Sequence, residues 1–135
     1  MKTVTDTVTQ MPRVLLHCII PGEPKSWERV GWRRGRAYNP NSEAKSRFLW
    51  QVKAATPMLA MDCVSRLGAR FEFWIGAKNA WTQDLDNLAK QLLDTLTGTV
   101  WKDDRQIDEI YARVHRGATA PQTEILIYET FQEQS

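Results

Sequence analysis

The feature that most constrains the fold is a change in the spacing of apolar residues in the middle of the chain. The stretch 69-ARFEFWIG-76 places apolar residues at every second position, which is the pattern of a β-strand with one buried face. From Leu85 the leucines recur at three and four residues, so they form one apolar stripe on an α-helix: Leu85, Leu88, Leu92 and Leu96. Gly98 is expected to end this helix. The chain therefore joins a strand to an amphipathic helix near its centre.

Four further elements follow from similar signals. Residues 13–20 predict a buried strand that ends at 21-PGEP-24. Residues 42–55 predict a helix, introduced by Asn-Pro-Asn and ended by a proline at 57. Residues 107–117 and 122–130 predict two strands, and the short connection between them favours a hairpin. Residues 57–68 give no clear signal, and 27–40 predict an irregular loop or a basic hairpin.

These elements predict an α+β fold in the order β-α-β-α-β-β, with a mixed sheet of about four strands and two main helices. A chain of 135 residues suits one domain, and its composition of 42% apolar and 25% charged residues is that of a globular protein. Residues 1–11 lack apolar periodicity, so we expect a flexible N-terminal tail followed by a single domain over 12–135.

Two observations address localisation. The longest apolar run, 14-VLLHCII-20, is far shorter than the roughly 20 residues that span a bilayer, and residues 1–10 have no signal-peptide core. Cys18 and Cys63 are too few for a disulfide framework and are expected to be small, reduced, buried side chains. The sequence therefore predicts a cytoplasmic protein that does not contact a membrane.

Charge is divided unevenly along the chain. Residues 25–53 contain eight Lys or Arg against two Glu, a balance of +6, so the remaining residues sum to −4 within a net charge of +2. Arginines alternate there with aromatic residues, a mixture that suits phosphate contacts and base stacking, although a solvated charged loop is the alternative. The candidate DNA-binding residues are Lys25, Arg29, Arg33, Arg34 and Arg36.

The acidic residues concentrate in 81–109, which hold seven carboxylates and three cations. One interpretation is structural: Asp84 caps the helix, and Lys90 forms surface ion pairs with Asp86 and Asp94, each contributing about 0.3–0.5 kcal/mol. The other places Asp84, Asp86 and one residue of Asp103/Asp104 around hard divalent cations, which prefer oxygen ligands. In that case the cation relieves the repulsion, and Lys90 stabilises negative charge or orients water.

The string 84-DLDNLAK-90, followed at a characteristic distance by 101-WKDD-104, resembles the signature of the RusA-type Holliday-junction resolvases. This resemblance implies a Mg²⁺-dependent homodimer, with Mn²⁺ as an alternative metal, that binds four-way DNA junctions and cuts two opposing strands symmetrically. Such enzymes serve recombination and repair, often in phages or prophages. The resemblance assigns metal binding to Asp84, Asp86 and Asp104, with Asp103 as the alternative third ligand, and a catalytic role to Lys90. Asn87 belongs to the same motif.

The chain departs from this family at one informative position. A basic residue often precedes the first aspartate, and here Gln83 stands there. Two other functions remain open from the residues themselves: a non-catalytic nucleic-acid-binding module, and a metal-dependent nuclease without preference for branched DNA. Both histidines, His17 and His115, are expected to be structural. Three tryptophans, Trp50, Trp74 and Trp81, are expected to lie in the core or in dimer contacts.

Overall fold

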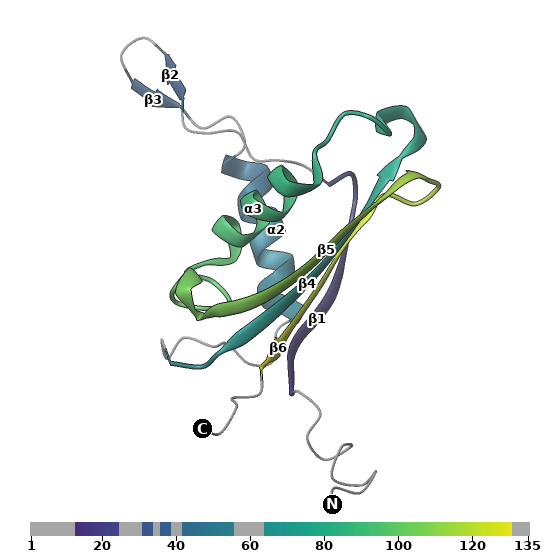
Figure 1. Cartoon of the computed structure of the whole chain (residues 1–135). Helices are drawn as coiled ribbons and strands as arrows, with labels where there is room; N and C mark the ends of the chain where they lie inside the picture. Colours follow the sequence, from purple (N-terminus) through teal and green to yellow (C-terminus); the bar gives the residue numbers. More distant parts are fainter. Residues whose placement is uncertain (1–12, 25–30, 34–35, 39–41, 56–63, 131–135) are drawn as a thin grey trace, which may run out of the picture.

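The computed structural model describes residues 13–24, 31–33, 36–38, 42–55 and 64–130. Its main sheet contains four strands, and two α-helices accompany it (Figure 1). The strands of this sheet and the two helices are, in chain order, β1 (Val14–Pro21), α2 (Ser42–Ala55), β4 (Leu67–Gly76), α3 (Leu85–Leu96), β5 (Ile107–Ala118) and β6 (Gln122–Glu129). The predicted α+β class, single domain and element order are confirmed. The predicted tail, residues 1–11, lies outside the described residues.

Two short strands form a separate ribbon. Strand β2 (Gly31–Arg33) pairs antiparallel with β3 (Arg36–Tyr38), in agreement with the basic hairpin that was one of the two expectations for this region. In Figure 1 the ribbon lies apart from the main sheet, near the N-terminal end of α2.

The order of the main sheet is β1-β6-β4-β5. Strand β4 pairs antiparallel with β6 and parallel with β5, which makes the sheet mixed. The predicted hairpin of the last two strands is therefore wrong, because β4 lies between β5 and β6. Burial explains the arrangement: seven of the ten residues of β4 are buried, whereas none of the twelve residues of β5 is. The most apolar strand thus takes an interior position, and the charged β5 forms an edge.

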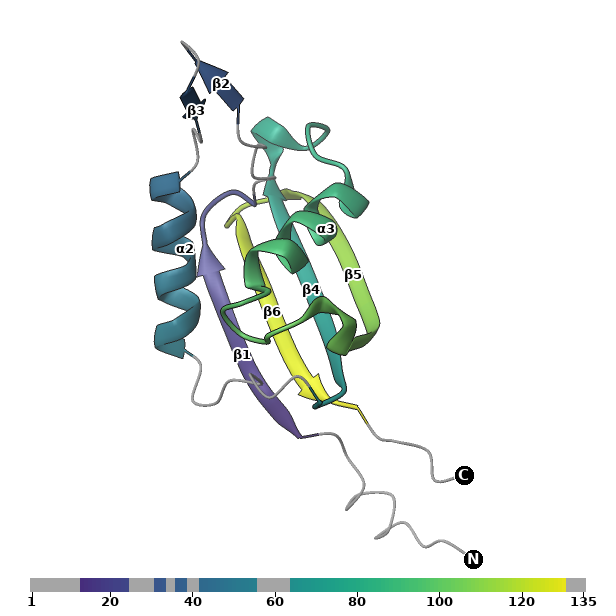
Figure 2. The same cartoon turned by 90° about the vertical axis from the view of Figure 1, so that its left-hand side faces the viewer.

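Both helices cover the same face of the sheet, with α2 beside β1 and α3 across β4 (Figure 2). The predicted leucine stripe packs there, since Leu88, Leu92 and Leu96 are at most 4% exposed. They meet the alternating residues of β4, Phe71 and Phe73, in one continuous core. Burial of this stripe is the main reason that the twelve-residue α3 is stable, since an isolated helix of that length is marginal in water.

Within the described residues, the other face of the sheet carries no helix (Figure 1), and it presents charged and polar side chains. Glu72 and Glu124 are direct cross-strand partners, and each bonds a histidine: His115 Nε2 lies 3.1 Å from Glu72 Oε1, and His17 Nε2 lies 2.6 Å from Glu124 Oε2. These contacts fit the structural role expected for both histidines. The ring of Trp74 stacks on His115, with centroids 4.6 Å apart.

For two of the tryptophans, exposure excludes one of the two expected roles and leaves the other, a dimer contact, as a prediction. Trp50 and Trp81 are 71% and 89% exposed, so a place in the core is excluded for both. The fully buried tryptophan of the described residues is Trp101, which follows α3 and closes the core beneath it. Cys18 is buried and unpaired as predicted, and burial raises the pKa of its thiol to about 11. Cys63 lies outside the described residues. Across the described ranges, every helix falls short of the length and apolarity that crossing a bilayer requires.

Candidate active site

The first group of predicted site residues lies where β4 leads into α3. After Gly76 the chain forms a 3₁₀ turn, η1 (Ala77–Asn79), and reaches Asp84, which is the N-cap residue of α3 in an extended conformation. The side chain of Asp84 makes no capping hydrogen bond. Asp86 lies in the first turn of the helix and is exposed. Two carboxylates therefore stand at the positive end of the α3 dipole, where negative charge is favoured.

The structural interpretation of these aspartates predicted a cap and two ion pairs. In the described part of the chain, no ion pair within 4.0 Å joins Lys90 to Asp86 or Asp94, and the side chain of Asp84 forms no cap. All four side chains are exposed on the helix surface. The interactions that would make them purely structural are thus not formed, and the carboxylate oxygens of Asp84 and Asp86 are accessible to an external ligand.

The loop that precedes Asp84 is held by Arg116, which lies near the end of β5. Its guanidinium donates from Nη1 to the carbonyl oxygen of Ala80 at 2.7 Å and from Nη2 to that of Gln83 at 2.8 Å. Within the loop, the Thr82 hydroxyl donates to the Asn79 carbonyl at 2.8 Å. Sequence reasoning missed Arg116 because both bonds join residues more than 30 positions apart, and no local motif indicates them.

The second group lies after α3, at the start of β5. Asp104 begins a second 3₁₀ turn, η2 (Asp104–Gln106), and its side chain is exposed. Asp103 is instead the N-cap of this turn and accepts hydrogen bonds from the backbone and the guanidinium of Arg105, the latter at 2.8–3.2 Å. Arg105 holds the pKa of the Asp103 carboxyl well below its usual range. Of the two aspartates, Asp103 has a structural role and Asp104 faces solvent.

Buried residues fix the position of this turn. Trp101 is fully buried, and its indole Nε1 donates to the Thr97 hydroxyl at 3.0 Å. The Gln106 side chain is 1% exposed, accepts from the backbone N–H groups of Lys102 and Asp103, and donates to the Ser65 carbonyl at 3.1 Å. Sequence reasoning also missed Gln106, although the D-x-x-Q spacing of a capping box was a usable signal.

An ion pair fixes the same turn from the start of β4. The Arg66 guanidinium forms two hydrogen bonds with the Asp108 carboxylate, one of them at 2.9 Å, and donates to the Arg105 carbonyl at 2.7 Å. This pairing holds the pKa of the Asp108 carboxyl below its usual value. Asp108 therefore has a structural partner and belongs to the support of the turn.

The register of the sheet separates the two groups within one chain. Strands β4 and β5 run parallel, with Leu67 opposite Ile107 and Gly76 opposite Ala118. Asp104 precedes Ile107 and therefore lies beside the N-terminal end of β4. Asp84 follows the C-terminal end of the same strand. The connecting helix α3 alone spans about 18 Å. In keeping with this, no three His, Cys, Asp or Glu side chains among the described residues gather as a metal site.

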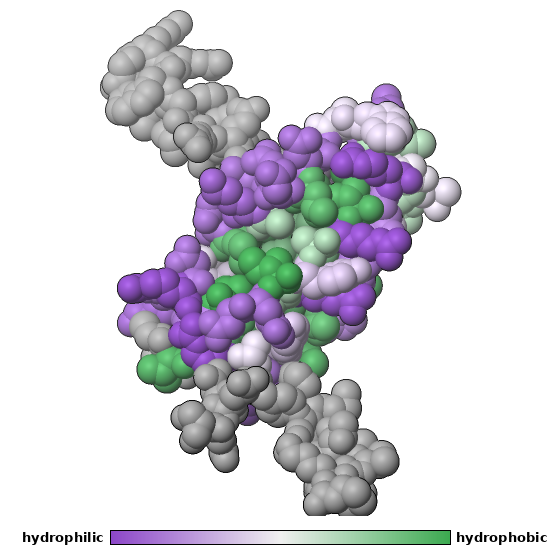
Figure 3. All heavy atoms as spheres, in the orientation of Figure 1, coloured by the Kyte–Doolittle hydropathy of each residue, from purple (hydrophilic) through white to green (hydrophobic). Residues whose placement is uncertain are grey.

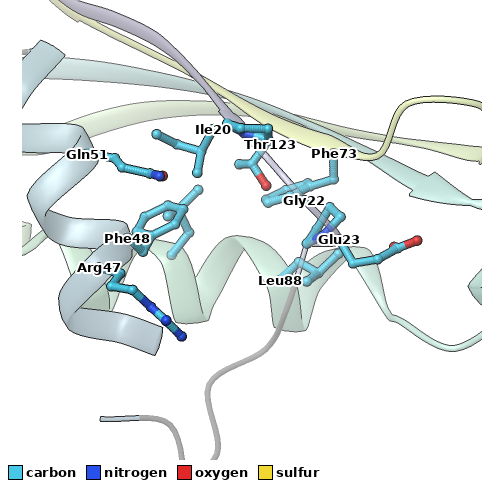
Figure 4. A pocket seen from close by; sticks show the side chains of 12 residues that line it. Ile20, Gly22, Glu23, Arg47, Phe48, Gln51, Phe73, Leu88 and Thr123 are labelled. Carbon is cyan, nitrogen blue, oxygen red and sulfur yellow. The ribbon is translucent and has the colours of Figure 1, made fainter. Parts of the chain in front are cut away.

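A cavity of about 330 Å³ lies near these elements and is distinct from the aspartates. It opens where α2, α3 and the end of β1 meet, and the side chains of Gln51, Phe48 and Thr123 point into it (Figure 4). Leu88 lines the same cavity from α3. Because Asp86 is two positions from Leu88, about 200° around the helix, its carboxylate points away from the cavity.

The predicted DNA-binding residues are placed only in part. Lys25, Arg29 and Arg34 lie outside the described residues. Arg33 and Arg36 are direct partners in the β2–β3 ribbon, which brings two arginine positions together at its end. Contact of these arginines with DNA stays a prediction.

The fold and the two acidic groups define a single-domain α+β protein with two accessible carboxylates at the start of one helix and a third at the start of the next strand. In a comparison with protein families, residues 21–128 of this chain match the model of the endodeoxyribonuclease RusA family. The chain therefore belongs to the RusA family, whose members are Holliday-junction-resolving endonucleases of DNA recombination. A comparison with curated proteins found no match.

Proposed function

We propose that this protein is a divalent-metal-dependent endonuclease that binds four-way DNA junctions as a homodimer and resolves them by paired, symmetric nicks. The observation that carries the proposal is the family match over a segment that contains the exposed motif aspartates Asp84 and Asp86. Among the described residues, the Asp84 side chain makes no capping hydrogen bond, and neither aspartate forms an ion pair. An endonuclease of this family acts on a phosphodiester, and exposed carboxylates beside it need a cation to offset their charge.

The donor set fits such a cation. Asp84, Asp86 and Asp104 offer only carboxylate oxygens, the ligands that Mg²⁺ and Mn²⁺ accept, and all three are exposed. The bound ion would supply Lewis acidity toward the attacking water and the scissile phosphate. Lys90 lies one helical turn after Asp86 and would place a positive charge beside the phosphate oxygens. Asp103 is not proposed as a ligand, because Arg105 already occupies its carboxylate.

The separation of Asp104 from Asp84 and Asp86 gives the proposed homodimer a chemical role. If one metal site needs all three carboxylates, two copies must meet so that Asp104 of one approaches the start of α3 in the other. The surface beside β5 supports such a contact, because Ile110 is 48% exposed on the side of this edge strand that faces the helices. Figure 3 shows hydrophobic residues exposed among hydrophilic ones on the face that contains α3 and β5.

A cleavage assay tests the activity. Purified protein is incubated with a labelled four-way junction or a matching linear duplex, with Mg²⁺ or with chelator. Paired nicks in the junction alone, lost with chelator and in Asp86→Asn, are expected. Asp94→Asn is the matched control, because Asp94 is exposed on the same helix outside the proposed set. Binding without cleavage at any metal concentration would favour a binding module, and equal cutting of both substrates would refute junction specificity.

Mixing two inactive variants tests the arrangement across two copies. In a heterodimer of Asp86→Asn with Asp104→Asn, a shared site leaves one complete set of carboxylates, whereas a site within one chain leaves none. Random assortment makes about half of the dimers mixed, so about a quarter of all sites are expected to recover. The variants are unfolded and refolded together so that the subunits assort. Recovery of single nicks supports the shared site, and no recovery refutes it.

A further inference from the structure

Trp81 is the most exposed large apolar side chain in the described residues, at 89%. It lies in the loop between η1 and α3, three positions before Asp84. A tryptophan in a monomeric protein normally buries most of its ring, as Trp101 does here. The exposed indole is therefore a surface that another molecule can cover.

Hydrogen bonds hold the backbone of the loop that carries this ring. The Ala80 and Gln83 carbonyls, on either side of Trp81 and Thr82, both accept hydrogen bonds from Arg116. Thr82 donates to the Asn79 carbonyl through its backbone N–H at 3.1 Å and through its hydroxyl at 2.8 Å. Because the backbone is held and an aromatic side chain has few rotatable bonds, this residue loses little conformational entropy when it binds a partner.

The chemistry around the ring favours a nucleotide. The Arg116 guanidinium carbon lies 5.8 Å from the centroid of the Trp81 ring, within the range of a cation–π contact. The same guanidinium bonds Gln83, the residue that replaces the basic residue frequent in this family. An aromatic face with a positive charge beside it matches the two parts of a nucleotide, the base and the phosphate.

We propose that Trp81 is a stacking platform for a base of the DNA strand close to the phosphate that is cut. The inference rests on the proposed function and extends it by naming a contact on the DNA. The nearness of Asp84 in sequence favours DNA over a second copy of the chain, because a strand that reaches the aspartates passes this loop. A subunit packed on Trp81 is the alternative that the experiment separates.

The experiment compares Trp81→Ala and Trp81→Phe with Trp50→Ala, a matched control with an exposed tryptophan on α2. Binding to a fluorescein-labelled four-way junction is measured by anisotropy in chelator, where no cleavage occurs. Loss of a stacked base is expected to raise the Kd of Trp81→Ala by about five- to 150-fold, which corresponds to about 1–3 kcal/mol. Trp81→Phe should lie between it and the wild type, and Trp50→Ala should match the wild type.

Three results would overturn the proposal or separate it from the proposed activity. Equal Kd values for Trp81→Ala and Trp50→Ala overturn the stacking role. A change in sedimentation coefficient of free Trp81→Ala, from dimer to monomer, overturns it in favour of a subunit contact. A wild-type protein that binds the junction but never cuts it with metal refutes the proposed activity, while the comparison of Kd values still decides the role of Trp81. A thermal melt confirms that each variant is folded.

Discussion

Replacing Gly68 by alanine is expected to destabilise the fold through a single neighbour, Tyr128. The two residues are cross-strand partners in β4 and β6, and the tyrosine ring lies over the glycine. A Cβ added at Gly68 would lie 2.5 Å from the Tyr128 hydroxyl oxygen and closer still to two ring carbons. Ordinary contact begins near 3.4 Å, so the ring must move by about 0.9 Å or more. That movement breaks the 2.7 Å hydrogen bond from the tyrosine hydroxyl to Glu109.

The cost follows from these two changes. Overpacking of this kind costs about 1–3 kcal/mol, and the lost hydrogen bond adds about 1 kcal/mol. We expect Gly68→Ala to lower the free energy of unfolding by about 2–4 kcal/mol, which for a domain of this size lowers Tm by about 6–16 °C. Urea unfolding followed by circular dichroism measures the free energy, and a thermal melt measures Tm.

A double-mutant cycle isolates the cause. In a Tyr128→Ala background the ring is absent, so Gly68→Ala should cost less than about 0.5 kcal/mol, or stabilise the strand because alanine loses less backbone entropy than glycine. The reasoning fails if Gly68→Ala melts with the wild type, or if its cost is the same with and without the Tyr128 ring.

The two neighbouring aspartates of η2 should separate in function: Asp103→Ala is expected to lower Tm by removing a cap while junction cleavage persists, whereas Asp104→Asn should abolish cleavage with Tm unchanged. Loss of cleavage in both variants with equal melting curves would contradict this division. The Asp108 carboxyl has a folded pKa below its unfolded value, so its stabilising pairing with Arg66 is complete above the unfolded pKa and is lost as pH falls through the folded one. The fall in Tm below about pH 4 should therefore be steeper for the wild type than for Asp108→Asn; parallel profiles would count against the pairing. The buried Cys18 thiol, with its pKa near 11, should react with Ellman's reagent at neutral pH only as fast as the protein unfolds, and rapid reaction of this thiol in native protein would show that it is accessible.

Local patterns in the sequence predicted most of the fold. Both α-helices were located by apolar periodicity and by their flanking signals, and their bounds, Ser42–Ala55 and Leu85–Leu96, agree with those patterns. The pairing of β5 was not predictable in this way, because adjacency in the chain favours a hairpin. The insertion of β4 depends on which strand has the most apolar surface to bury, which is a property of the whole sheet.

The candidate site shows the same division between local and distant information. The motif indicated Asp84 and Asp86 as candidates. The capping geometry of η2, which sets Asp103 apart from Asp104, is known only once the backbone is known. The distance between the two acidic groups depends on the parallel register of β4 and β5, and no short motif encodes it. Arg116 was missed for a similar reason, because its partners precede it by 36 and 33 positions.

The sheet order also bears on how such a protein emerges from the ribosome. Strand β6, the last of the described strands to be synthesised, lies between β1 and β4, which make no ladder with each other. A nascent chain that has released β1, β4 and β5 can form the parallel pair, yet β1 has no partner until β6 arrives. A chain interrupted before residue 122 would leave the edges of β1 and β4 unpaired and the core open. Completion of the fold is thus delayed until nearly the whole described sequence has been synthesised. Incomplete chains of this endonuclease-family protein therefore lack the complete four-stranded sheet.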